Sequence, residues 1–172
     1  MKRVGKVQVY TGDGKGKTTA AMGQAVRALG HGQMVLIIQF LKGRRSGEIE
    51  ILGKMENVTI ERFGSSKFVC GNPTSEDTVL AEKGFEKARE AVLSGRYDLV
   101  ILDEINMLVD YKMLDVNRVV ELIKERPKGV ELILTGRNAH PQVVEVADLV
   151  SEVRAVKHYY KDGIGARPGV EY

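Results

Sequence analysis

Cysteine is almost absent from this sequence, because Cys70 is the single one among 172 residues. A disulfide within the chain needs a second cysteine, and zinc or iron–sulfur sites built from thiolates need several. The sequence therefore excludes an internal disulfide, a multi-cysteine metal site and an iron–sulfur cluster held by this chain alone. The histidines, His31, His140 and His158, do not show a metal-ligand spacing either.

Long apolar runs are also missing. No apolar stretch approaches the roughly 20 residues that a membrane-spanning helix needs. The first residues, "MKRVGKVQVYTG", meet charge and glycine too early for a signal peptide. From these absences we expect a cytoplasmic protein with no membrane partner.

The charged residues lack a basic block. Lys and Arg number 26 against 23 Asp and Glu, which gives a net charge of +3, and they are scattered along the chain. Nucleic-acid-binding domains typically concentrate positive charge on one face, whereas an anionic small ligand suits such a surplus equally well. We therefore expect no nucleic-acid partner.

Short apolar runs alternate with longer amphipathic segments, a pattern typical of an α/β fold with a mostly parallel sheet and helices on both faces. No internal repeat or linker interrupts it, so we predict one domain over residues 1–172, with a glycine-containing tail over 157–172. The expected strands are 7–11, 34–40, 58–63, 97–105, 130–136 and 150–156. The expected helices are 17–29, 76–93, 115–127 (Asp115 as N-cap, Pro127 at the end) and 140–149.

The stretch "VQVYTGDGKGKTTAAMG" places a glycine-rich loop between an expected strand and helix. Its glycines allow positive φ, so that successive N–H groups can form an anion-binding concavity at the helix N-terminus. Lys17 would bring its charge to phosphate oxygens, and Thr18 would offer its hydroxyl to Mg²⁺. The predicted nucleotide-binding residues of the loop are Gly12, Asp13, Gly14, Lys15, Gly16, Lys17, Thr18 and Thr19.

The loop is one residue shorter than the usual phosphate-binding loop. That loop has a glycine, four further residues and then Gly-Lys-Ser/Thr, but Thr11 stands where the first glycine belongs. The shortening indicates a phosphate cradle of altered shape. A dinucleotide-binding fingerprint fits poorly, because no acidic residue ends the expected strand 34–40.

The segment "LVILDE" supports a nucleotide site independently of the loop. Asp103 and Glu104 follow a buried strand, and an acidic residue in this place commonly holds Mg²⁺ in nucleotide-binding α/β folds. Successive residues of a strand point to opposite faces, so the two carboxylates should point differently. We predict a metal site from Thr18, Asp103 and Glu104, filled by Mg²⁺ or alternatively Mn²⁺.

Five segments of the sequence resemble the ATP:corrinoid adenosyltransferases, which act on cob(I)alamin and cob(I)yrinic acid a,c-diamide. They are "GDGKGKTTAA", "IIQFLKG", "LVILDEIN", "LTGRNAHPQVVEVADLVSEV" and "KHYYKDGIGARPGVEY", and together they span nearly the whole chain. The resemblance implies a P-loop NTPase-like fold in which the short loop holds ATP in a reversed orientation. It also implies that a cobalt(I) corrinoid attacks the ribose 5′-carbon and that inorganic triphosphate leaves, in adenosylcobalamin biosynthesis or salvage.

The same resemblance assigns roles to particular residues. It implies that Lys17, Thr18 and Glu104 are catalytic and that Gln39 and Arg137 contact ATP. Phe40, Lys42 and Asn106 are expected on the corrinoid side. The ending "RPGVEY" resembles a family ending near the active site, without a role for any single residue.

The resemblance further implies ATP and a reduced corrinoid as substrates, and a homodimer. The sequence lacks flavin and cluster motifs. Electrons that bring cobalt to the +1 state must then come from an external donor, and a reduced flavoprotein is expected.

The sequence departs from the family where the family often has "FTWET". Here "KFVCGNPTSED" aligns Phe68 with the phenylalanine and Cys70 with the tryptophan, and the chain has no tryptophan at all. In the family this aromatic pair helps to displace the lower axial ligand of cobalt. We expect Phe68 to keep that role on the corrinoid side, and Cys70 to give a smaller contact there.

Two alternatives stay open from the sequence. An ordinary P-loop ATPase or kinase would act at the γ-phosphate, but it needs a residue that orients water or an acceptor, and the sequence offers no clear one. An ATP-dependent nucleic-acid-binding module would show steeply salt-dependent DNA binding.

Overall fold

The computed structural model describes residues 4–43, 46–65 and 72–172. Its strands form one six-stranded sheet in the order β3-β2-β4-β5-β1-β6, and every neighbouring pair is parallel. This confirms the predicted α/β class and its parallel sheet. The strands are β1 (Val7–Thr11), β2 (Val35–Phe40), β3 (Val58–Phe63), β4 (Leu99–Asp103), β5 (Glu131–Thr135) and β6 (Leu149–Glu152).

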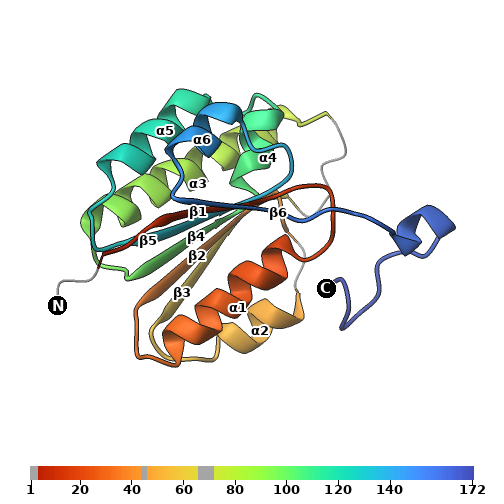
Figure 1. Ribbon diagram of the computed structural model, residues 1–172, viewed down its shortest axis with the longest axis horizontal. Helices are drawn as coiled ribbons and strands as arrows, with labels where there is room; N and C mark the ends of the chain where they lie inside the picture. Colours follow the sequence, from red (N-terminus) through yellow and green to blue (C-terminus); the bar gives the residue numbers. More distant parts are fainter. Residues whose placement is uncertain (1–3, 44–45, 66–71) are drawn as a thin grey trace.

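Helices cover both faces of the sheet, as predicted (Figure 1). On one face lie α1 (Lys17–Leu29) and α2 (Gly47–Leu52). On the other lie α3 (Ser75–Ser94), α4 (Ile105–Asp110), α5 (Val116–Glu125) and α6 (Pro141–Val146). A short 3₁₀ helix, η1 (Tyr159–Asp162), interrupts the tail. Among the helices described, none combines the length and the apolar character needed to cross a bilayer.

The central strands are buried on both sides, which explains their continuous apolar sequence. In β4, Leu99 and Ile101 pack in the cluster beneath α1 and α2, whereas Val100 and Leu102 pack in the cluster beneath α3 to α6. Alternate side chains of one strand thus enter two separate cores, as in other parallel sheets that are covered on both faces.

The helix that follows β4 was not predicted, and the predicted strand 97–105 extends too far. The strand ends at Asp103, Glu104 adopts a left-handed conformation with φ of 68°, and α4 begins at Ile105. The apolar residues of "LVILDEI" continue across this break, so their pattern could not reveal it. A second six-residue helix, α2, was also missed, because so short a segment shows little helical periodicity.

Parallel pairing brings the carboxyl ends of the strands to one edge of the sheet. The glycine-rich loop follows β1, and β5 separates β1 from β4 in the sheet. Gln39 at the end of β2 pairs in register with Asp103 at the end of β4. Residues far apart in sequence therefore meet at this edge, which is where ligands bind in open α/β sheets.

Candidate active site

The glycine-rich loop is shaped by its glycines and by the segment after β6. Gly12 and Gly16 have φ of 100° and 121°, a region that favours glycine. A Cβ on Gly12 would lie 2.4 Å from the carbonyl oxygen of Val153, so glycine is also required for space. The N–H of Gly14 donates to the same oxygen at 2.7 Å, which fixes the loop against the segment that follows β6.

Lys17 begins α1 and folds its side chain back into the loop. Its ammonium donates to the carbonyl oxygens of Gly12 at 2.7 Å and Gly14 at 2.8 Å. Burial lowers the pKa of Lys17 below its ordinary value, while the nearby Glu104 carboxylate acts in the opposite direction. The loop thus fixes one positive charge at the N-terminus of a 13-residue helix, where anions are stabilised.

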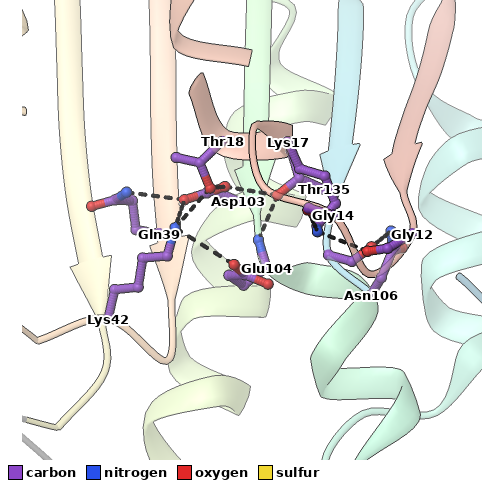
Figure 2. Close-up of polar contacts among 11 residues, drawn as sticks. Gly12, Gly14, Lys17, Thr18, Gln39, Lys42, Asp103, Glu104, Asn106 and Thr135 are labelled. Carbon is purple, nitrogen blue, oxygen red and sulfur yellow. Dashed lines mark hydrogen bonds and ion pairs between the residues drawn. The ribbon is translucent and has the colours of Figure 1, made fainter. Parts of the chain in front are cut away.

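Asp103 is the centre of a buried polar network (Figure 2). Its Oδ1 accepts hydrogen bonds from the hydroxyls of Thr18 at 2.9 Å and Thr135 at 2.7 Å. Its Oδ2 accepts from Gln39 Nε2 at 3.0 Å and from Lys42 Nζ at 2.7 Å. The carboxylate is fully buried, and these four donors together satisfy its hydrogen-bonding capacity.

The charges around Asp103 determine its protonation. Burial alone would raise the pKa of Asp103, but the Lys42 ammonium and the donated hydrogen bonds outweigh burial and hold the pKa below its ordinary value. Burial alone would lower the pKa of Lys42, but the Asp103 and Glu104 carboxylates outweigh burial and raise the pKa above its ordinary value. Both shifts favour the charged forms, so Lys42 and Asp103 form a true ion pair.

Glu104 stands at the break between β4 and α4. Its N–H donates to Thr135 Oγ1 at 2.9 Å, which holds its left-handed backbone, and its Oε1 lies 3.6 Å from Lys42 Nζ. Burial and the neighbouring Asp103 carboxylate raise the pKa of Glu104. Backbone strain of this kind is common at functional sites, and here it turns Glu104 toward Lys42.

The arrangement around the Lys42 ammonium fits a divalent cation. Thr18 Oγ1, Asp103 Oδ2 and Glu104 Oε1 lie 2.8, 2.7 and 3.6 Å from Nζ. Hydroxyl and carboxylate oxygens are the donors that Mg²⁺ prefers. In the part of the chain that the structure describes, no group of three or more His, Cys, Asp or Glu side chains could hold a metal. Mg²⁺ would therefore need the hydroxyl and further oxygens from substrate.

A cavity of about 640 Å³ opens above this network. Cationic and polar groups line it from the loop and from the segments that follow β2 and β5, and the end of the tail, Gly169 to Tyr172, lines it as well. Of the predicted residues, the cavity lining includes Asp13, Gly14, Lys15, Gly16, Lys17, Thr18, Thr19, Lys42, Glu104 and Arg137.

Other predicted residues lie elsewhere. Phe40 is fully buried in the core, where a Cβ on Gly84 of α3 would lie 2.7 Å from its ring. Phe40 is therefore a packing residue in this structure, and its role on the corrinoid side stays a prediction. Gln39 and Asn106 are also buried and support the site from beneath it. Phe68 and Cys70 lie outside the described residues.

The tail folds against itself through Glu171. Its carboxylate accepts from the hydroxyl of Tyr159 and, at 2.7 Å, from the N–H of Arg167. The Arg167 guanidinium stacks 4.8 Å from the centre of the Tyr159 ring. Hydrogen bonds from Arg167 and Tyr159 lower the pKa of Glu171 to about 2. The neighbouring Val170 accepts from Lys15 Nζ at 2.6 Å, so the folded tail reaches the loop.

Replacing Glu171 with glutamine should loosen this tail without altering the sheet. The amide removes the charge that Arg167 and Tyr159 contact, so we expect faster amide hydrogen exchange over residues 167–172 only. Glu145→Gln, an exposed change on α6, is the control. Unchanged exchange in the tail of Glu171→Gln would show that this carboxylate does not hold it.

Sequence reasoning missed Thr135, although it contacts both acidic residues. Thr135 ends β5, the strand between β1 and β4, and a polar residue at that edge was the available signal. It also missed apolar cavity residues such as Leu41, Met107 and Tyr111. Their side-chain types gave no such signal, because apolar residues are usual in packing positions.

Comparison with known proteins adds an independent observation. The family model described as ATP:corrinoid adenosyltransferase BtuR/CobO/CobP matches residues 3–172. The chain belongs to this family. The match covers nearly the whole chain.

Three relatives illustrate the similarity. The corrinoid adenosyltransferase of Sinorhizobium sp is 39% identical over 98% of this chain and 80% of its own length. That of Escherichia coli (strain K12) is 37% identical over 98% of this chain and 86% of its own. The corrinoid adenosyltransferase CobA of Salmonella typhimurium (strain LT2) is 35% identical over the same shares. The chain is an enzyme of this kind, and action at the γ-phosphate is not favoured.

Proposed function

We propose that the cavity binds ATP with its triphosphate in the glycine-rich loop and its ribose 5′-carbon facing a cobalt(I) corrinoid. The cobalt supplies the electron pair of the new cobalt–carbon bond. The bond between the 5′-carbon and oxygen breaks, and inorganic triphosphate leaves with that bond's electron pair. The observation that carries this proposal is the gathering of Lys17, Lys42 and Arg137 with the short loop in one cavity.

These residues would act on the leaving group rather than on the carbon. Negative charge builds up on the triphosphate as it departs, and donors fixed in advance stabilise such charge without having to reorganise. Lys17 is already held at the loop by two carbonyl contacts, and Arg137 lines the same cavity. Since cobalt is the nucleophile, the protein need not supply one.

Mg²⁺ would be held by Thr18, Asp103 and Glu104, and when bound it neutralises charge on the triphosphate. The chain's own residues prepare that position. Thr135 and Gln39 donate to Asp103 and orient its carboxylate, while the left-handed backbone at Glu104 aims the second carboxylate at the same place.

The corrinoid side of the cavity has apolar residues. Leu41, Met107 and Tyr111 line the same cavity as Lys42, and apolar lining suits a large ring system. Asn106 donates to the carbonyl of Gly136 at 3.5 Å. We propose that it positions the turn bearing Arg137. The roles of Phe68 and Cys70 stay predictions.

We also propose an electron donor, an oligomeric state and a cellular location for this protein. A reduced flavoprotein would deliver the electrons that bring cobalt to the +1 state, and the enzyme would work as a homodimer in the cytoplasm. The chain would act as one domain over residues 1–172, with Mn²⁺ able to replace Mg²⁺.

Product identification tests the proposal. The protein is incubated with ATP, Mg²⁺ and chemically reduced cobalamin, and both products are identified. We expect adenosylcobalamin with a cobalt–carbon bond and an equal amount of inorganic triphosphate. Release of ADP and phosphate without any need for corrinoid would refute the proposed reaction.

A further inference from the structure

The ammonium of Lys42 occupies the position proposed for the metal ion. Its Nζ lies 2.8 Å from Thr18 Oγ1, 2.7 Å from Asp103 Oδ2 and 3.6 Å from Glu104 Oε1. These are the same oxygens that would ligate Mg²⁺ (Figure 2). Two cations cannot share one set of oxygens at such distances, because like charges repel strongly at close range. Lys42 and Mg²⁺ must therefore exclude each other.

The main chain around Lys42 is closely packed, whereas its side chain is partly exposed and borders the cavity. Leu41 donates its N–H to the carbonyl of Phe63 at 3.1 Å, and a Cβ on Gly64 would lie 2.4 Å from the nitrogen of Lys42. The side chain, in contrast, is 28% exposed and lines the cavity. A flexible four-carbon stem carries the ammonium. It can thus leave the carboxylates while the backbone stays in place.

We propose that Lys42 is a resident cation that neutralises Asp103 and Glu104 before ATP binds and gives up its place to Mg²⁺ when the metal–ATP complex enters. The freed ammonium then turns into the cavity and contacts the triphosphate. This inference rests on the proposed metal position. The exchange also predicts that metal and ATP bind cooperatively, which does not follow from the metal position alone.

The cooperativity follows from where the ammonium can go. Metal that binds alone must displace the Lys42 ammonium from a buried carboxylate. The displaced ammonium then has no new anionic partner. When ATP is present, phosphate oxygens receive the same ammonium. Metal alone can bind only those molecules in which Lys42 has moved away. Because these are a small fraction, the apparent affinity for metal alone is lowered, and ATP removes that penalty.

Metal binding without ATP or corrinoid tests the exchange, and it needs no turnover. Free Mn²⁺ is measured by its electron paramagnetic resonance signal during titration of wild type, Lys42→Met and Lys42→Gln. We expect both variants to bind Mn²⁺ at least about tenfold more tightly than wild type. Lys6→Met is the matched control, because Lys6 forms an exposed ion pair with Asp148 at 2.9 Å, and its Mn²⁺ affinity should equal that of wild type.

A second readout covers variants of lowered stability. The unfolding midpoint of Lys42→Met should rise when Mg²⁺ is added without ATP, since a bound ligand stabilises the folded state, whereas wild type should respond little. Glu104→Gln in the Lys42→Met background should abolish both the tight Mn²⁺ binding and the Mg²⁺ effect.

The outcomes separate this inference from the proposed function. Equal Mn²⁺ affinity in wild type and both Lys42 variants, with binding lost on Glu104→Gln, would overturn the exchange and leave the metal position intact. Tight Mn²⁺ binding that survives Glu104→Gln would place the metal elsewhere, and the exchange would fall with it. Only tight, Glu104-dependent binding in the Lys42 variants supports the exchange.

Discussion

Replacing Lys17 with alanine should lower kcat/KM for ATP by about tenfold to hundredfold. Lys17 is the cation that the loop fixes through Gly12 and Gly14. A charge-assisted hydrogen bond to phosphate contributes about 1.5–3 kcal/mol, and each decade in rate or affinity corresponds to about 1.4 kcal/mol. Steady-state kinetics with ATP as the varied substrate, at saturating reduced cobalamin, measures the loss.

The control for this change is Lys87→Ala. Lys87 is an exposed residue of α3 that pairs with Glu90 at 3.6 Å, and its loss should leave the kinetics unchanged. Circular dichroism establishes that Lys17→Ala is folded. If a folded Lys17→Ala variant keeps wild-type kcat/KM for ATP, the glycine-rich loop does not bind the phosphates as proposed.

Replacing Asp103 with asparagine should cost about 3 kcal/mol of folding stability, since it removes one partner of a buried ion pair. Asparagine keeps the shape, but it leaves Lys42 without its nearest anion and offers an amide group to donors such as Gln39 Nε2. For a chain of this length, about 2–4 °C per kcal/mol predicts that the thermal midpoint falls by about 6–12 °C. Calorimetry without metal or ATP measures it.

The contribution of Asp103 to folding stability should depend on pH. The pKa of Asp103 in the folded protein lies below its ordinary value, so its ionisation stabilises the fold at neutral pH. That contribution is complete above the unfolded pKa of about 3.9 and is lost as pH falls through the lowered folded value. The stability difference between wild type and Asp103→Asn should therefore shrink below about pH 4.

Asp148→Asn is the matched control for Asp103→Asn. Asp148 also pairs with a lysine, but the two side chains are 36% and 58% exposed, and exposed pairs contribute about 0–1 kcal/mol. If Asp103→Asn is as stable as Asp148→Asn, the buried pair of Lys42 and Asp103 does not contribute to folding stability as its geometry indicates.

The sequence predicted the fold well because its central strands β2, β4 and β5 are buried and therefore read as continuous apolar runs. β1, β3 and α1 have the predicted bounds, and the glycine-rich loop marks the end of β1 and the start of α1. The same apolar continuity hid the break after Asp103, because Ile105 continues the pattern while the backbone at Glu104 turns left-handed. Local pattern cannot encode a turn that tertiary contacts with Thr135 hold in place.

The sequence predicted which charged residues of the site come together, but it did not predict all of the contacts between them. Residues 13–19 of the loop, with Glu104 and Arg137, meet in one cavity, because each lies at the carboxyl edge of a parallel sheet. The resemblance placed Phe40 on the corrinoid side, yet Gly84 allows α3 to pack directly on it. Lys42 was expected on the corrinoid side, and its direct contact with Asp103 depends on a strand register that the sequence does not show.

The central claim is that the loop serves a reaction at the 5′-carbon of ATP, in which all the phosphates leave as one group. The most direct test replaces ATP with its β,γ-methylene analogue, whose terminal phosphate cannot be transferred or hydrolysed. With Mg²⁺ and chemically reduced cobalamin, we predict adenosylcobalamin formation and release of the intact methylene-bridged triphosphate. Failure of the bound analogue to form any cobalt–carbon bond, under conditions in which ATP is converted to ADP, would contradict the account.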